Sequence, residues 1–409
     1  MNYIKLRKNN LCVENISALK LAKNYKTPFY CYSLSQIRNN YHVLKNAFST
    51  IKPIICFAIK ANSNLSLIRE LKKMGLGADV VSAGELLKAT KAGINPKKIV
   101  FSGIGKTEEE IKMAIKKRVL LINVESEGEL NLINKISKKI SRKISIGLRL
   151  NPNVTGKTHQ KISTGGKEEK FGLVYNDFIN LSKKIKKMKN LTLEGISVHI
   201  GSQITSVDPF KKVLSAINKI ITKTKLNFKF IDLGGGMGIA YSKKEKQINL
   251  MQYAKLVNKF LKNKNSQIIF EPGRFIVGNA GILITKIIYI KKSNNKNFII
   301  LDAGMNNLMR PALYNAHHEI VPIKKTAKLL KGNLKFVGPV CESSDKFSSQ
   351  KNFSKIKEGD YVGLTNVGAY GMSLSSNYNA RPTIAEVMVS GSSHKIIRKR
   401  QSLADLVNN

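Results

Sequence analysis

Apolar runs and amphipathic stretches alternate along the first two thirds of the chain. Runs rich in apolar and β-branched residues predict eight strands, at Ile54–Ile59, Gly77–Val81, Ile99–Phe101, Leu120–Val124, Ser145–Leu150, Leu191–Val198, Phe230–Leu233 and Gln267–Glu271. Apolar residues recur at helical spacing between them, in Asn64–Met74, Ala83–Ala92, Thr107–Lys116, Glu127–Lys138, Asp177–Lys187, Pro209–Thr222 and Met251–Leu261. Strands that alternate with helices are typical of a parallel sheet with crossover helices. Eight strands over about 220 residues predict a (β/α)8 TIM barrel, which is an α/β fold.

The pattern changes after residue 275. Short β-rich runs separated by Gly, Asn and Ser turns follow, at Ile282–Ile290, Phe298–Leu301, Lys335–Val337, Asp360–Leu364 and Thr383–Val389. They predict a second, mainly antiparallel β domain. The segment before Pro28 is too short to fold alone and is expected to join it. The expected domains are therefore 1–27 with the β domain, 28–275 as the barrel and 276–409 as the β domain.

An open doubly wound sheet would show the same alternation of strands and helices. Such sheets often carry the fingerprint GxGxxG after a strand. The glycine-rich run here, GGGMGIA after Leu233, does not complete it, because Ile239 stands where the third Gly or Ala belongs. This difference favours the barrel.

Hydropathy and cysteine usage point to a cytoplasmic protein without metal. No apolar stretch approaches the roughly 18 residues of a membrane helix, and Ile282–Ile290 contains a Lys. The opening residues, MNYIKLRKNNLCVEN, lack the apolar segment of a secretory signal. The four cysteines are far apart and show no zinc spacing. We expect Cys341 to differ from the other three, which are expected to be small core residues.

The net charge of +44 suggests that the protein could bind nucleic acid. However, Lys outnumbers Arg by 59 to 11, whereas bidentate recognition of phosphates and bases favours Arg. The lysines are also spread through every predicted helix. We therefore expect no specific nucleic-acid partner and no membrane partner, and a basic nucleic-acid-binding protein is the non-enzyme alternative.

Two predicted strands end in residues with candidate chemistry. FAIKAN, Phe57–Asn62, ends the first strand and places Lys60 among apolar neighbours, which would favour a neutral, nucleophilic amine. An ordinary surface lysine is the alternative. VHIGSQ, Val198–Gln203, ends the sixth strand. His199 in that motif is either structural or stacks on a planar cofactor.

The last two predicted strands are followed by LGGGMG, Leu233–Gly238, and by EPGR, Glu271–Arg274. Loops after the seventh and eighth strands of barrels often bind phosphate, and glycines let backbone N–H groups approach an anion closely. Glu271 either pairs with a cationic ring nitrogen or forms a structural ion pair. Asp79 and Arg149, at the ends of the second and fifth strands, complete a charged ring at this end of the barrel.

The β-rich part contains further motifs: MRPALY (Met309–Tyr314), GPVCESSD (Gly338–Asp345) and GAYGMSLSSNYN (Gly368–Asn379). Cys341 lies beside Glu342 in a loop with Gly and Pro, where a thiol could supply a proton. A papain-like Cys–His pair has no matching motif. Arg310 and Tyr314 are four residues apart and could jointly bind a carboxylate.

In order and spacing, these motifs resemble those of the diaminopimelate decarboxylases. These enzymes belong to the pyridoxal-phosphate-dependent family of alanine-racemase-like barrel fold, which also includes ornithine and arginine decarboxylases. The resemblance runs from about Pro28 to the final segment HKIIRKRQSLADL and includes HQKISTGGKEEKFGL, His159–Leu173. Met237 replaces a Leu that is common in the family, which is an apolar exchange.

The resemblance implies pyridoxal 5'-phosphate as cofactor. It implies that Lys60 is bound covalently to the cofactor, that His199 stacks on the ring, and that Glu271 keeps the ring nitrogen protonated, so that the ring accepts electrons. The complete set expected to bind the cofactor is Lys60, Asp79, Arg149, His199, Ser202, Gly234, Gly235, Gly236, Glu271, Pro272, Gly273, Arg274 and Tyr370. The expected catalytic residues are Lys60, His199, Glu271 and Cys341.

The resemblance also implies the reaction, decarboxylation of meso-2,6-diaminopimelate to L-lysine and CO2 as the last step of lysine biosynthesis. Substrate binding is expected from Arg274, Arg310, Tyr314, Glu342 and Tyr370. Cys341 would donate the proton, and it would reach the site with Glu342 from a partner subunit, which implies a homodimer. A decarboxylase of ornithine, arginine or a polyamine precursor is the enzymatic alternative.

Overall fold

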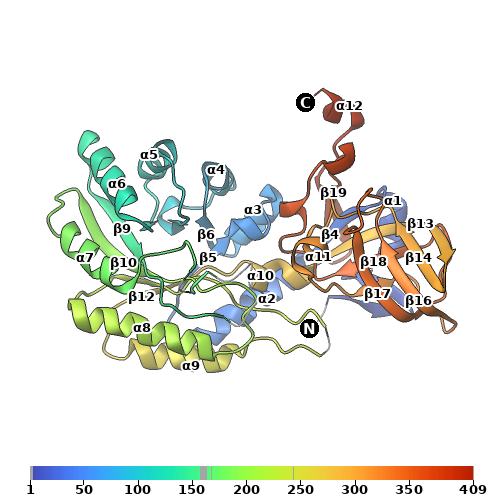
Figure 1. Cartoon of the computed structure of the whole chain (residues 1–409), viewed down its shortest axis with the longest axis horizontal. Coiled ribbons are helices and arrows are strands. Elements are labelled where there is room, and N and C mark those ends of the chain that lie inside the picture. Colours follow the sequence, from blue (N-terminus) through green and yellow to red (C-terminus); the bar gives the residue numbers. More distant parts are fainter. Residues whose placement is uncertain (1–2, 157–163, 167, 243, 409) are drawn as a thin grey trace. The chain divides into compact units, whose positions relative to one another are not determined.

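The computed structural model describes residues 3–156, 164–166, 168–242 and 244–408, and it divides into two compact units (Figure 1). The first, here called the barrel unit, comprises His42–Ile239 and Lys246–Arg274. The second, the β unit, comprises Met1–Tyr41, Ala240–Glu245 and Phe275–Asn409. Each unit is described by itself.

Eight parallel strands close into a barrel in the barrel unit. They are β5 (Ile54–Ala58), β6 (Gly77–Val80), β7 (Ile99–Phe101), β8 (Leu121–Val124), β9 (Ile144–Arg149), β10 (Leu191–Ser197), β11 (Phe230–Asp232) and β12 (Gln267–Phe270). Each pairs with its neighbours in chain order, and pairing of β12 with β5 closes the barrel, with Ile269 opposite Ile54. The predicted (β/α)8 barrel is confirmed.

Helices surround the barrel (Figure 1). They are α3 (Leu65–Lys73), α4 (Ala83–Lys91), α5 (Glu108–Lys117), α6 (Glu127–Lys139), α7 (Tyr175–Ile185), α8 (Asp208–Thr224) and α9 (Leu250–Leu261), with the 3-10 turns η1 (Ile59–Ala61) and η2 (Pro96–Lys98). Several begin at a side chain that accepts from a free backbone N–H group, as Asn64 and Ser126 do. Thr107 and Glu110 form a capping box on α5.

The inside of the barrel changes from apolar to polar along its axis. One apolar cluster contains Cys56, Val100, Leu121, Phe230 and Ile269. Toward the C-terminal ends of the strands, buried polar residues replace them, namely Asp79, Asn123, Arg149, Ser197, Asp232 and Glu271. Because buried polar groups are costly unless they are paired, this end is where function is expected.

The β unit contains two sheets. A three-stranded sheet is formed by β1 (Ile4–Arg7), β2 (Asn10–Val13) and β3 (Ile16–Ser17). A nine-stranded, mainly antiparallel sheet contains β4 (Phe29–Ser33), β13 (Gly281–Ser293), β14 (Lys296–Leu301), β15 (Ile320–Pro322), β16 (Leu329–Val337), β17 (Lys346–Ser354), β18 (Tyr361–Thr365), β19 (Ala385–Ser390) and β20 (Ser393–Arg398). The predicted antiparallel β domain is confirmed, whereas β4, β15, β17 and β20 of this sheet were not predicted.

The boundary expected at residue 28 differs from the structure. The strand β4 pairs antiparallel with β13 and parallel with β19, so it belongs to the β unit and not to the barrel. The segment Ala240–Glu245 also belongs to the β unit, where the Asn366 side chain donates to the Tyr241 carbonyl at 3.4 Å. All five side chains of β4 are buried, and a fully buried strand does not reveal from sequence which sheet it joins.

The remaining helices are α1 (Ala18–Asn24), α2 (Leu34–Ala47), α10 (Arg274–Val277), α11 (Arg310–Tyr314) and α12 (Leu403–Val407), with the 3-10 turns η4 (Gly278–Ala280), η5 (Met372–Leu374) and η6 (Tyr378–Ala380). Within the described residues, no helix combines the length and apolar character that a membrane span requires. The cytoplasmic location remains a prediction.

Candidate active site

Lys60 lies in η1, directly after β5, and its amine faces a carboxylate. Its Nζ is 2.6 Å from Oδ2 of Asp79, the third residue of β6. Asp79 is fully buried, whereas about a third of the Lys60 side chain (36%) is exposed. The other Asp79 oxygen, Oδ1, is buried without a hydrogen-bond partner among the described residues. The surroundings of Lys60 are therefore not only apolar, as its flanking residues suggested, because a buried carboxylate pairs with its amine.

His199 follows β10 and is a neutral imidazole with a defined tautomer. Burial, then the positive charges of Arg149 and Lys60, hold the pKa of His199 well below its usual value. The Gly235 N–H donates to His199 Nδ1 at 3.2 Å, so the ring proton lies on Nε2. Thr164 donates to the His199 carbonyl at 3.0 Å.

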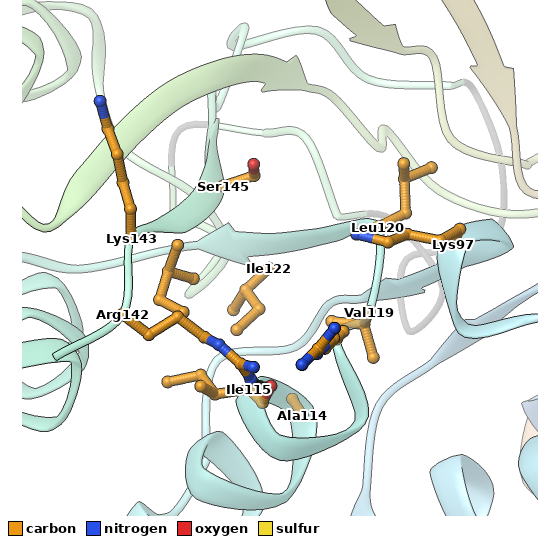
Figure 2. A pocket seen from close by; sticks show the side chains of 11 residues that line it. Lys97, Ala114, Ile115, Val119, Leu120, Ile122, Arg142, Lys143 and Ser145 are labelled. Atoms are coloured by element: carbon orange, nitrogen blue, oxygen red, sulfur yellow. Dashed lines mark hydrogen bonds between the residues drawn. The ribbon is translucent and has the colours of Figure 1, made fainter. Parts of the chain in front are cut away.

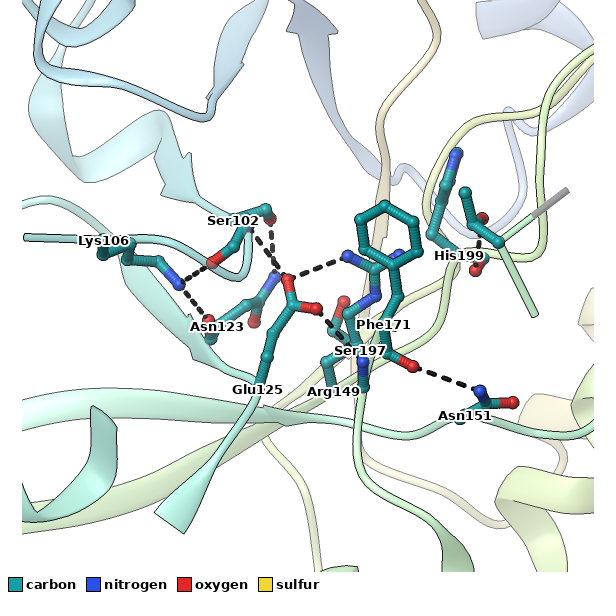
Figure 3. Close-up of polar contacts among 12 residues, drawn as sticks. Ser102, Lys106, Asn123, Glu125, Arg149, Asn151, Phe171, Ser197 and His199 are labelled. Atoms are coloured by element: carbon teal, nitrogen blue, oxygen red, sulfur yellow. Dashed lines mark hydrogen bonds and ion pairs between the residues drawn. The ribbon is translucent and has the colours of Figure 1, made fainter. Parts of the chain in front are cut away.

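Arg149, the last residue of β9, is held by a carboxylate that sequence reasoning missed (Figure 3). Its Nη1 is 2.8 Å from Oε1 of Glu125, which also accepts from the Gly103 N–H at 3.0 Å. The other Glu125 oxygen accepts from the Gly172 N–H at 3.1 Å, and the Arg149 guanidinium lies 5.0 Å from the centre of the Phe171 ring. Glu125 directly follows β8, and this position at a strand end was its only signal.

The glycine run after β11 packs so closely that no side chain fits. A Cβ at Gly234 would lie 2.7 Å from His199 Nδ1, and one at Gly235 would lie 2.2 Å from the Glu271 carbonyl oxygen. Gly234 and Gly236 also adopt φ values of 63° and 85°, which favour glycine. The run therefore leaves a cradle lined by backbone.

Two further predicted residues, Ser202 and Arg274, contact each other in the barrel unit. The Arg274 Nη2 and Nε donate to Ser202 Oγ at 3.0 and 3.3 Å. Arg274 is buried and belongs to the EPGR turn after β12, where the Pro272 carbonyl accepts from the Ala58 N–H at 3.3 Å. A Cβ at Gly273 would lie 2.9 Å from Ala61. A hydroxyl, a guanidinium and a glycine turn thus supply donors that suit a phosphate group.

Glu271, the first residue after β12, is a buried acid with a raised pKa. Burial, then the nearby Asp232 and Asp79 carboxylates, raise its pKa well above the ordinary value. It shares a hydrogen bond with Asp232, and two carboxyl groups can share one only if one of them is protonated. Asp232 ends β11 and was not predicted as a site residue.

Arg310 and Tyr314 lie in the β unit, as the first and last residues of α11. The buried Arg310 guanidinium is 2.9 Å from His318 Nε2 and 4.9 Å from the centre of the Tyr241 ring. Tyr370, also in the β unit, adopts φ 57°, a left-handed conformation that is rare for a tyrosine. Such a strained backbone persists only where the surrounding structure enforces it, and strained residues often lie at functional sites.

Cys341 is the exposed cysteine, while Cys12, Cys31 and Cys56 are buried, as expected. Its backbone N–H donates to Asn379 Oδ1 at 3.1 Å. The neighbouring Glu342 is exposed, and hydrogen bonds from Ser344 and Tyr378 lower its pKa, so it is an anion at neutral pH.

A pocket of about 280 Å³ lies at the opposite end of the barrel, beside the starts of β8 and β9 (Figure 2). Arg142, which lines it, donates to the Ile115 carbonyl at 3.2 Å and so caps the C-terminal end of α5. No predicted site residue lines this pocket. Within the described residues, no cluster of His, Cys, Asp and Glu is arranged to hold a metal ion. Residues 159–163 and 167 of the HQKISTGGKEEKFGL motif lie outside the described residues.

Comparisons with known proteins identify the family of the chain. Residues 34–278 match the model of the pyridoxal-binding domain of the pyridoxal-dependent decarboxylases. The chain is 40% identical to diaminopimelate decarboxylase of Aquifex aeolicus over 98% of this chain and 95% of that protein. It is 43% identical to diaminopimelate decarboxylase of Helicobacter pylori over 95% of this chain and 96% of that protein.

A solved structure gives the same result. The crystal structure of Helicobacter pylori diaminopimelate decarboxylase complexed with L-lysine superposes with a TM-score of 0.91 at 41% identity, covering 95% of this chain and 98% of that chain. Fold and site thus define a pyridoxal-dependent carboxy-lyase. Within that class, the chain belongs to the diaminopimelate decarboxylase family, which confirms the resemblance seen in the sequence.

Proposed function

We propose that this protein removes the carboxyl group from the D-configured centre of meso-2,6-diaminopimelate and releases L-lysine and CO2. The observation that carries the proposal is the grouping of Lys60, His199 and Glu271 around the glycine run at one end of the barrel. Relatives named diaminopimelate decarboxylase, about 40% identical over nearly the whole chain, support this substrate over other amino acids.

The residues present fit pyridoxal phosphate. The cradle that any Cβ would fill, together with the buried Arg274 and the Ser202 hydroxyl, suits the phosphate. In our proposal the phosphate is held by Ser202, Gly234, Gly235, Gly236, Gly273, Arg274 and Tyr370, and Pro272 lies against the cofactor beside them. Lys60 would hold the cofactor covalently, and Arg149 and Asp79 would flank it. When bound, the cofactor delocalises the electron pair that remains after CO2 departs.

Two side chains, Glu271 and His199, would set the charge around the cofactor ring. The raised pKa of Glu271 favours its protonated form, which can share that proton with a ring nitrogen placed against it. His199 is uncharged, so it presents a flat ring that can stack without adding positive charge. Asp79 remains as counter-charge for the Lys60 ammonium when the substrate amine takes the place of that lysine.

The reaction then needs a proton at the α-carbon. The bond from this carbon to the carboxyl carbon breaks, CO2 leaves, and the electron pair stays on the α-carbon side. We assign the proton that restores this centre to the Cys341 thiol, which is exposed and therefore reachable. The thiolate regains its proton from solvent.

We assign the distal end of the substrate to residues of the β unit. A distal carboxylate needs a cation, which Arg310 supplies together with the Tyr314 hydroxyl. The distal ammonium needs an anion, and Glu342 is charged at neutral pH. Arg274 and Tyr370 complete the proposed substrate set. A substrate with only a distal ammonium would leave Arg310 without a function.

We further propose that the enzyme is a homodimer in which Cys341 and Glu342 serve the site of the partner subunit. Both residues are exposed in the single chain. Asn379 holds the backbone of Cys341, and the buried Asp345 accepts from the Val340 N–H at 2.7 Å. The loop that would reach a second copy is thereby fixed in the free subunit.

The test is CO2 release from meso-diaminopimelate, ornithine and arginine by protein reconstituted with pyridoxal phosphate, with the cofactor-free protein as control. We expect release from meso-diaminopimelate alone, and L-lysine as the product. Release from ornithine or arginine with none from meso-diaminopimelate would replace the proposed substrate. Absence of cofactor binding would remove the proposal altogether.

A further inference from the structure

Asp232 is a carboxylate inside the barrel whose two oxygens both accept hydrogen bonds, and it has no role in the function proposed above. It is fully buried at the end of β11. Its Oδ1 accepts from the Gly234 N–H at 2.9 Å. Its Oδ2 accepts from Asn123 Nδ2 at 3.0 Å and from Ser197 Oγ at 3.3 Å. Four strands of the barrel, including β12 through Glu271, therefore meet at this carboxyl group.

The contact with Gly234 fixes the first residue of the cradle. Asp232 holds the Gly234 N–H, and the Glu271 N–H donates to the Gly234 carbonyl at 2.8 Å. Both polar backbone groups of a residue in the left-handed region are thus satisfied by neighbouring strand ends. The next N–H along the chain, that of Gly235, points at His199 Nδ1.

We propose that Asp232 is a positioning residue of the cofactor site. Its carboxylate holds the Gly234 N–H, and the Glu271 N–H holds the Gly234 carbonyl, so that the next N–H, that of Gly235, fixes the orientation and tautomer of His199 and the rest of the cradle stays open for a phosphate. The inference rests on the proposed function for the identity of the cofactor. The arrangement of Asp232, Gly234 and His199 is independent of the substrate.

A purely structural role for Asp232 is the competing explanation, since a buried, hydrogen-bonded carboxylate also stabilises a fold. The two explanations differ in what an asparagine does. Asp232→Asn keeps an oxygen for the Gly234 N–H, whereas Asp232→Ala removes it. If Asp232 acts through its contact with the Gly234 N–H, Asp232→Asn should therefore keep the cofactor affinity that Asp232→Ala loses.

The first experiment titrates cofactor-free protein with pyridoxal phosphate and follows the absorbance of the bound cofactor. We expect Asp232→Ala to raise the dissociation constant at least about tenfold, as for the loss of a hydrogen bond to a charged group. Asp232→Asn should stay within about threefold of the parent protein. The matched control is Ser197→Ala, which removes only the longest contact of Asp232 and should also stay within about threefold.

The second experiment needs no cofactor. The chain has six histidines, so nitrogen-15 labelling of histidine gives few signals, and His199→Gln assigns the one of interest. We expect the parent protein and Asp232→Asn to show His199 with its proton on Nε2. Asp232→Ala should show a mixture of tautomers or a shifted Nδ1 signal, because Gly235 no longer holds that nitrogen.

The inference is overturned if folded Asp232→Ala binds the cofactor as tightly as the parent and leaves the His199 signals unchanged. If Asp232→Ala does not fold, Asp232→Leu takes its place, because its side chain fills a similar volume and likewise offers the Gly234 N–H no acceptor. Unchanged affinity and unchanged His199 signals in that variant would equally overturn it. A parent protein that binds no cofactor would contradict the proposed function, while the His199 signals would still decide the role of Asp232.

Discussion

At the scale of single residues, the site is governed by carboxyl groups that share one small buried volume. Asp79 pairs with the Lys60 amine, whereas Glu271 and Asp232 share a hydrogen bond. Burial and the neighbouring carboxyl groups raise the pKa of Glu271. The site therefore contains one carboxyl group that faces an amine and another whose protonated form is favoured.

Replacing Lys60 tests the covalent anchor. We expect Lys60→Ala to abolish both turnover and the cofactor–protein adduct that borohydride reduces, since a primary amine at the end of β5 is required for it. Lys73→Ala, at an exposed lysine paired with Glu70, should keep both. The measurement is the mass of the intact protein after reduction. A reducible adduct that persists in Lys60→Ala would identify another lysine as the anchor.

Glu271 should make the cofactor-free protein less stable as the pH rises. Its folded-state pKa is raised above the unfolded value, so its stabilising contribution is full below about pH 4.5 and is lost as the pH climbs toward the folded-state pKa. Glu271→Gln removes this loss. The free energy of unfolding of the variant should therefore exceed that of the parent by a margin that grows with pH, by up to about 1.4 kcal/mol per pH unit.

Urea unfolding between pH 5 and pH 8 measures this margin. Glu109→Gln, at a largely exposed glutamate, is the control and shows how far the exchange of a carboxylate for an amide by itself changes stability at each pH. A difference for Glu271→Gln that does not grow with pH would mean that burial does not raise the pKa of Glu271. That result would also weaken its assignment as the proton carrier.

At the scale of elements, the sequence predicts the barrel well because each strand there has a regular environment. Every predicted barrel strand ends within one residue of the observed one. The domain boundary at residue 28 was misplaced because the partners of β4, which are β13 and β19, lie some 250 and 350 residues further on, and the local pattern does not encode the partner of a strand.

The residues of the candidate site also fall into those that the sequence predicted and those that it missed. Motifs reveal residues whose type is unusual at a strand end, such as Lys60 and His199. Asp232 and Glu125 were missed because their functions depend on the groups around them, a glycine N–H and a guanidinium, which only the folded barrel brings together. The roles of all these residues remain predictions until they are tested.

The glycine run after β11 offers a test of an element. Gly235→Ala would place a Cβ 2.2 Å from the Glu271 carbonyl oxygen, a backbone atom that moves only with β12. We expect it to destabilise the protein by about 1–3 kcal/mol and to weaken cofactor binding. Gly105→Ala is the matched control, because a Cβ there meets nothing within 4 Å. Unaltered stability and affinity in Gly235→Ala would show that the cradle is wider than the structure indicates.

At the scale of the whole molecule, the net charge of +44 should be incidental to function. The charge comes mainly from lysines distributed over many helices. We expect weak binding to DNA that falls steeply with salt and does not distinguish one sequence from another, as for contacts to phosphates alone. Competition between specific and random DNA at several salt concentrations measures this. A sequence preference that survives at physiological salt would contradict the expectation.

The proposed sharing of sites between two subunits can be tested by complementation. Lys60→Ala and Cys341→Ala are each inactive or nearly so, and mixing them under conditions of subunit exchange forms hybrids. If Lys60 and Cys341 of one site come from different chains, each hybrid has one site with both lesions and one with neither. Random exchange at equal amounts makes about half of the dimers hybrid, so roughly a quarter of all sites are intact.

The activity of the mixture, after subtraction of the residual activity of Cys341→Ala, should therefore approach a quarter of that of the parent protein. Exchange is verified with differently tagged chains, and unmixed variants carried through the same treatment are the controls. A site built within one chain gives no recovery, because every site then keeps exactly one lesion. Verified exchange without recovery would place Cys341 in the site of its own chain or exclude it as the proton donor. A second mixture, of Lys60→Ala and Glu271→Gln, carries both changes in the same barrel and should recover no activity. Recovery in the first mixture and none in the second would show that each site takes Lys60 from one chain and Cys341 from the other.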